Sequence, residues 1–222
     1  MTFCRKVVIL SVFAILLAGL GMGLFMSISV GPTIFAILRY SVNSGWKAGI
    51  SFIIGVSLSD ILYVVIANFM TDWLAALMQH LQLIGYIGAL LFIAMGLHGY
   101  FKKIKVTRNK NDDAIIKGKD YTKIFASGFL MNTLNPGVII TWLTAVAAIS
   151  TMTSSGRFVF FCSCLSLILS IDLLKVLTAQ KLRKKLTPRN IVYLNRISAL
   201  CILGLGLFLL IKTMLGIKIG SF

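Results

Sequence analysis

Long stretches without a charged side chain limit what this sequence can fold into. A helix that crosses a bilayer needs about 20 largely apolar residues, and one soluble domain has no place for several such helices. Six charge-poor runs are present, at residues 7–38, 48–68, 73–101, 124–156, 158–171 and 197–211. Only 13% of the residues are charged, and the mean hydropathy is +0.95. The sequence therefore predicts an all-α polytopic membrane protein with six transmembrane helices in one domain, 1–222.

Charged residues inside these runs are few. Asp60 interrupts the second run, and the fifth reaches spanning length only by including Asp172 and Lys175. The sixth reaches it if Lys212 extends its ammonium group to the membrane surface.

The net charge is +16, and the basic residues lie mainly in the connections between these runs. Sixteen of the 22 lysines and arginines lie in the first, third and fifth connections, which must share one membrane face. Cytoplasmic loops carry the excess of Lys and Arg, so both termini are expected outside and segments 102–121 and 181–189 inside, in a bacterial inner membrane. Arg39 and Lys47 are counted in the first connection. Cations spread between apolar runs also argue against nucleic acid as a partner.

The beginning of the chain has a second interpretation. Arg5 and Lys6 precede an apolar stretch, which is typical of a secretory signal whose cleavage would leave five spans. The apolar run continues well beyond a cleavage site at Ala18 to Gly21, into Gly31–Pro32, and this favours a retained first helix.

Two halves of the chain follow the same plan. The polar loop 102–121 separates repeat one, 7–101, from repeat two, 122–216. Each half opens on a long uncharged run with a proline break, continues with a span that carries one acid, and closes with a third span. Because three is an odd number of crossings, the second copy enters from the opposite face, which predicts two inverted three-helix repeats.

The proline breaks, at Gly31–Pro32 in the first helix and Asn135–Pro136 in the fourth, are candidate binding positions. Proline removes a helical N–H and favours the first position of a new helix. The start of such a half-helix offers N–H groups and partial positive charge to a carboxylate. We therefore assign substrate binding to both breaks and to Asn132, with further polar groups at Ser27, Ser29, Thr33 and Thr133. A packed proline kink without a ligand is the alternative.

The two intramembrane acids, Asp60 and Asp172, are the candidates for proton coupling. A carboxylate placed in the bilayer costs at least about 2.5–3.5 kcal/mol, so it faces a cavity, pairs with a cation or takes up a proton. Asp60 has no cation within one helical turn, whereas Lys175 follows Asp172 at the ion-pair spacing of three residues. A neutral aspartic acid that only joins helices is the alternative for Asp60.

These elements resemble the LysE/RhtB family of amino-acid exporters. The corresponding residues are Gly31–Pro32, then Gly55 through Asp60, then the stretch Gly-Phe-Leu-Met-Asn-Thr-Leu-Asn-Pro at 128–136. The chain departs from the family pattern at Val30, which replaces a proline, and at Gly137, where lysine is frequent. The resemblance implies a small inner-membrane protein that exports amino acids, with protons as the coupling ion and a homodimer as an option.

The sequence also bears on other functional classes. A membrane enzyme needs a catalytic set such as Gly-x-Ser-x-Gly with histidine, or paired acids; none is present, and the chain has no glutamate. No ATP-binding Gly-x-x-x-x-Gly-Lys-Ser/Thr motif occurs, and no cofactor is expected. A scaffold subunit without transport activity and a metal-ion exporter of the same superfamily remain the alternatives to amino-acid export.

Overall fold

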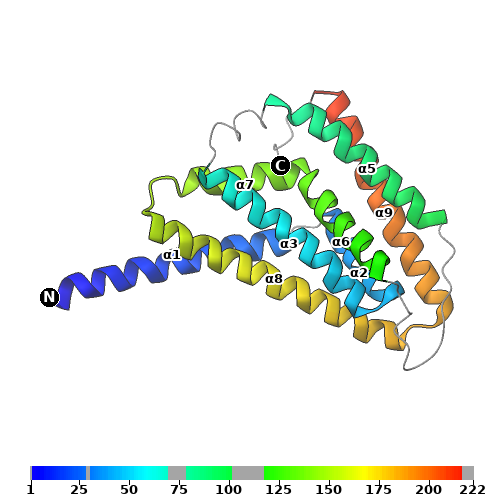
Figure 1. The fold of residues 1–222 in the computed structure, drawn as a ribbon, viewed down its shortest axis with the longest axis horizontal. Helices are drawn as coiled ribbons and strands as arrows, with labels where there is room; N and C mark the ends of the chain where they lie inside the picture. The colour runs from blue at the N-terminus through cyan, green and yellow to red at the C-terminus, as the bar shows by residue number, and fades with distance from the viewer. Residues whose placement is uncertain (1, 29–30, 70–78, 102–117, 217–222) are drawn as a thin grey trace.

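The computed structural model describes residues 2–28, 31–69, 79–101 and 118–216, and this part of the chain is helical with short connections. Figure 1 shows the arrangement of its helices. They are α1 (Thr2–Ile28), α2 (Pro32–Ser44), α3 (Trp46–Phe69), α5 (Leu81–Phe101), α6 (Gly118–Thr133), α7 (Pro136–Ala148), α8 (Ser154–Lys185) and α9 (Pro188–Met214). The predicted all-α fold is confirmed for these residues.

The described helices provide four to six candidate membrane spans. Helices α3, α5, α8 and α9 each contain a segment long and apolar enough to cross a bilayer. Two further candidates are bent pairs, α1 with α2 at an angle of 69° and α6 with α7 at 62°. If each bent pair is one span, the count is six, which is the number that the apolar runs predict.

Both bends lie at the prolines. Helix α2 begins at Pro32 after the extended residue Gly31, and α7 begins at Pro136 after the extended residue Asn135. Proline cannot donate the hydrogen bond that would continue the preceding helix, yet it fits the first position of the next one. The sequence positions of the helix breaks were therefore predicted correctly.

Close helix pairs link the two halves of the chain. Helix α3 packs along α6, α1 packs along α8, and α5 packs along α9 (Figure 1). At the first crossing, a Cβ atom at Gly55 would collide with the Phe125 carbonyl, and one at Gly128 with the Phe52 carbonyl. Small residues let the two backbones approach, as is usual for helix contacts within membranes.

Asparagines join three helix ends. Asn195 of α9 donates a hydrogen bond from Nδ2 to the Gly99 carbonyl oxygen of α5, at 3.0 Å, and accepts one from Asn43 of α2. Figure 1 shows the end of α5, the end of α8 and the start of α9 at the same end of the molecule. The basic segment 181–189 lies at this end of the helices, which we call the basic end. Its cytoplasmic location remains a prediction.

Two boundaries differ from the expectation. Arg39, which was counted in the first connection, lies inside α2 and is buried, because α2 continues to Ser44 before the turn at Gly45. Residues 102–117 of the predicted loop lie outside the described part of the chain. Its last residues belong to α6, which begins at Gly118 and has Asp120 in its first turn, where a negative charge stabilises a helix.

Candidate functional site

Asp60 lies beside the break between α6 and α7. The residue is 4% exposed on α3. Its Oδ1 accepts a hydrogen bond from Asn132 Nδ2 at 2.8 Å and another from Trp142 Nε1 at 2.9 Å. Asn132 is near the end of α6 and Trp142 is in the second turn of α7. The intramembrane acid is therefore bonded to the helices on both sides of the break.

The last turn of α6 is held by further polar contacts to α3. Thr133 Oγ1 donates a hydrogen bond to Ser59 Oγ at 2.9 Å, and the Tyr63 hydroxyl donates to the Thr133 carbonyl oxygen. A helix end leaves carbonyl groups without intrahelical partners, and in a membrane they must be satisfied by other protein groups. The end of α6 is thus hydrogen-bonded to three polar residues of α3, Ser59, Asp60 and Tyr63.

The N–H groups at the start of α7 already have hydrogen-bond acceptors in this conformation. Asn135 Oδ1 accepts a hydrogen bond from the Gly137 N–H at 3.0 Å, and the Asn135 carbonyl accepts from Val138 N–H at 3.0 Å and Ile139 N–H at 3.2 Å. We expected these donors to be open to a substrate carboxylate; here Asn135 occupies them. The start of α2 differs, because Gly31 provides no side-chain cap. At α2 the Gly31 carbonyl accepts a hydrogen bond from the Ile34 N–H at 3.3 Å, so the two breaks differ in the side-chain cap that Asn135 provides to the Gly137 N–H.

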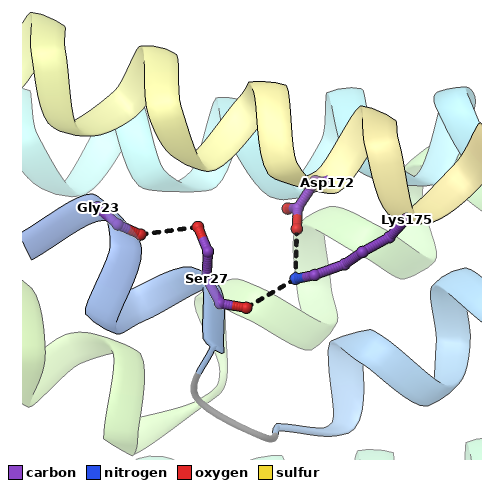
Figure 2. Close-up of polar contacts among 4 residues, drawn as sticks. All are labelled: Gly23, Ser27, Asp172 and Lys175. Carbon is purple, nitrogen blue, oxygen red and sulfur yellow. Dashed lines mark hydrogen bonds and ion pairs between the residues drawn. The ribbon is translucent and has the colours of Figure 1, made fainter. Parts of the chain in front are cut away.

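The second acid lies near the other break. Lys175 Nζ is 2.8 Å from Asp172 Oδ1 on the same helix, and it also donates to the Ser27 carbonyl oxygen of α1 at 2.9 Å (Figure 2). Ser27 Oγ in turn donates to the Gly23 carbonyl oxygen at 2.7 Å. Ser27 is the next-to-last residue of α1, where carbonyl groups lack helical partners. Lys175 therefore connects the second acid to the end of the first half-helix.

A small cavity adjoins Asp60. It has a volume of about 130 Å³ and lies between Ser57, Asp60 and Ile61 of α3 and residues of α8 that include Ser166 and Leu169. Pockets that bind small molecules are usually about 300 Å³ or larger, whereas a water molecule fills about 30 Å³. In this conformation the cavity is large enough for water beside the acid but not for a typical substrate.

The predicted residues thus form two groups. Asp60 and Asn132 meet directly, next to the break at Asn135–Pro136, whereas Asp172 and Lys175 lie near the end of α1. Ser29 lies outside the described residues. Sequence reasoning missed Trp142, Tyr63 and Ser59. The only signal for Trp142 was an indole in an apolar run six residues after a proline break, because a buried indole N–H needs an acceptor.

We expect Asn135→Leu to weaken substrate binding about fivefold, because the first turn of α7 loses the cap that keeps its N–H groups in position, and this loss outweighs the release of the Gly137 N–H. Loss of such a cap costs about 1 kcal/mol, and leucine does not reduce the hydrophobicity needed for insertion. The measurement is the apparent affinity for exchange of a transported substrate in proteoliposomes. Asn135→Ser is the matched control, since serine also caps helices. Unchanged affinity in a normally expressed Asn135→Leu variant would contradict the assignment.

Comparison with known proteins agrees with the three motifs. The family model described as LysE type translocator matches residues 24–213, a segment that includes both breaks and both acids. No curated protein and no solved structure matches the chain significantly. The resemblance that the motifs indicated is therefore confirmed. The chain belongs to the LysE type translocator family, and it is a multi-pass membrane transporter rather than an enzyme.

Proposed function

We propose that this transporter exports amino acids or related small polar metabolites across the bacterial inner membrane by proton antiport. The observation that carries the proposal is that each intramembrane acid lies at the helix break of the other half. Asp60, from the first half, is bonded to Asn132 beside the second break. Asp172, from the second half, is linked through Lys175 to Ser27 beside the first break.

The helix packing supports two inverted three-helix repeats. In this interpretation α1 and α2 correspond to α6 and α7, α3 corresponds to α8, and α5 corresponds to α9. If the repeats are equivalent, each helix contact should have a counterpart in which the two halves are exchanged. The α3–α6 pair then becomes α8–α1, and the α2–α8 pair becomes α7–α3; all four pairs are in contact. In transporters of this kind the substrate binds between the repeats, at helices broken near mid-membrane.

Asp60 is the proposed proton carrier. Both of its hydrogen bonds end on Oδ1, so we place proton exchange at Oδ2, through the adjoining cavity. A neutral Asp60 releases its proton toward the cytoplasm, and the resulting carboxylate attracts the ammonium group of an amino acid. After the substrate leaves on the outer side, a proton from that side neutralises the carboxyl group again. Export is thereby coupled to one proton moving inward.

A panel of radiolabelled amino acids tested for counterflow in proteoliposomes examines this function. We expect accumulation of at least one labelled amino acid when the vesicles are preloaded with the same compound. A scaffold subunit would exchange none of them, and substrate would not raise its melting temperature in detergent. An arm with Mn²⁺ and Zn²⁺ tests the metal-exporter alternative. Exchange of a metal ion without exchange of any amino acid would overturn the proposed substrate class.

A further inference from the structure

Arg39 of α2 is a buried cation that the proposed proton cycle does not use. The residue is only 5% exposed, and among the described residues no carboxylate forms an ion pair with it. Its Nη1 donates to the Met95 carbonyl oxygen at 3.2 Å, and the guanidinium carbon lies 5.7 Å from the centre of the Tyr40 ring. A guanidinium has five N–H donors and stays charged. Buried charges are normally paired, so the Arg39 donors that have no partner among the described residues point to an anionic ligand.

The guanidinium borders a second cavity, larger than the one beside Asp60. This cavity has a volume of about 460 Å³ and lies between α2, α5 and α6, with Ser44, His98 and Ser127 among the polar residues on its wall. Its volume is within the range of about 300–1,000 Å³ that is usual for small-molecule sites. It adjoins the basic end of the helices, and its wall also includes Lys123 and Asp120, which lie 4.0 Å apart and offset each other's charge, so Arg39 is the cation of this wall without a carboxylate partner among the described residues. A small anion from the basic end can therefore reach Arg39.

The position of Arg39 is built into the helix packing. A Cβ atom at Gly99 of α5 would overlap the guanidinium in its present position, so this glycine lets the end of the Arg39 side chain lie directly against α5. The same Gly99 has its carbonyl oxygen bonded to Asn195 of α9. Met95, one turn earlier on α5, provides the carbonyl that orients Nη1. Helix α5, itself bonded to α9, thus holds the cation of α2 at the cavity wall, which is the preorganisation that a binding group requires.

We infer that Arg39 binds the substrate carboxylate at a loading site on the basic end, before the substrate reaches the helix breaks. The inference rests on the proposed export of amino acids, and it adds a second binding position. Seven residues separate Arg39 from Pro32 along α2, which corresponds to about 10 Å. Guanidinium groups bind carboxylates in a bidentate manner, which lysine cannot reproduce. The ligand class is a small organic carboxylate, with the α-carboxyl group of an amino acid as the intended member.

Arg39→Gln tests this in proteoliposomes of phosphatidylcholine and phosphatidylethanolamine, with uptake measured from the basic end. We expect the KM of a transported amino acid to rise about 10- to 100-fold, because a hydrogen-bonded charge is lost. Arg39→Lys should recover only part of this. Arg196→Gln removes the same charge from an exposed arginine over the Tyr100 ring, and its KM should stay within about twofold. Equal KM values for the two glutamine variants would overturn the inference.

A second measurement does not depend on transport. Phenylglyoxal modification of Arg39, followed by mass spectrometry of the detergent-purified protein, should be slowed by acetate and glycine but not by methylamine. If the wild type exchanges no amino acid and acetate still protects Arg39, the proposed function fails while the carboxylate site stands. If acetate and glycine do not protect Arg39 from phenylglyoxal, Arg39 does not bind a small carboxylate. The same conclusion holds if only the anionic lipid phosphatidylglycerol protects it. A melting temperature of Arg39→Gln near that of Arg196→Gln shows that the comparison is between folded proteins.

Discussion

Asp60→Asn is expected to abolish proton-driven export while leaving the protein folded. Asparagine has nearly the same shape as aspartate, and its carbonyl oxygen can accept the hydrogen bonds that Asn132 and Trp142 now donate to Oδ1. It cannot take up or release a proton. The α6–α7 break therefore keeps its contacts to α3, whereas the proposed coupling step and the charge that attracts the substrate ammonium group are lost.

The expected size of this effect follows from the driving force. A gradient of one pH unit provides about 1.4 kcal/mol per proton, which sustains about a tenfold substrate ratio for one-to-one antiport. In antiport the substrate accumulates in the more acidic compartment. Wild-type proteoliposomes should approach this ratio, and the Asp60→Asn variant should stay near a ratio of one. Exchange of labelled for unlabelled substrate at equal pH needs no net proton movement and should continue, with a higher KM because the amide attracts the substrate ammonium group less strongly.

Asp172→Asn provides the comparison for Asp60. Because Lys175 pairs with Asp172, this acid is expected to stay charged through the cycle, and its replacement should reduce coupling less. The measurement is substrate accumulation under the same imposed pH gradient, for both variants and the wild type. Full gradient-driven accumulation by Asp60→Asn would remove Asp60 from the proton cycle and leave it as a residue that joins helices.

Lys175→Met is expected to lower the free energy of unfolding by roughly 3 kcal/mol, because it leaves a buried carboxylate without its cation. The Asp172 side chain is 8% exposed and that of Lys175 is 22% exposed. The substitution also removes the donor that Lys175 directs to the Ser27 carbonyl oxygen near the break of the first helix. Unfolding with SDS in mixed detergent micelles is the measurement.

A second substitution, at Asp172, separates the effect of the unpaired carboxylate from the effect of the lost hydrogen bond to the Ser27 carbonyl. Replacing a buried pair by apolar residues is often nearly neutral, so Lys175→Met with Asp172→Leu should recover most of the stability. About 1 kcal/mol should remain missing, since the Ser27 carbonyl stays unsatisfied. Lys123→Met is the control, because Lys123 is mostly exposed and only 4.0 Å from the exposed Asp120. Equal stability of the single and double variants would show that Asp172 does not depend on Lys175.

Local sequence patterns were sufficient for features that depend on neighbouring residues. Long apolar runs indicated helices in lipid, because an uncharged run of such length has no other stable surroundings. Pro32 and Pro136 indicated where helices begin, because the missing N–H acts within one turn. The three-residue spacing of Asp172 and Lys175 places the two side chains on one helical face, and the ion pair is present. The order of the motifs along the chain was also sufficient to indicate the family.

Contacts between distant residues were decided only by the tertiary structure. Asp60 and Asn132 are 72 positions apart, and no local rule pairs them, because the α3–α6 crossing fixes their contact. The same limit applies to Lys175 and the Ser27 carbonyl, which are 148 positions apart. Arg39 was the clearest error: a cation near the end of an apolar run was expected in a connection. Helix α2 continues past Arg39, and α5 covers its side chain. A cation that was used to predict which ends of the helices face the cytoplasm is therefore a buried group at a cavity.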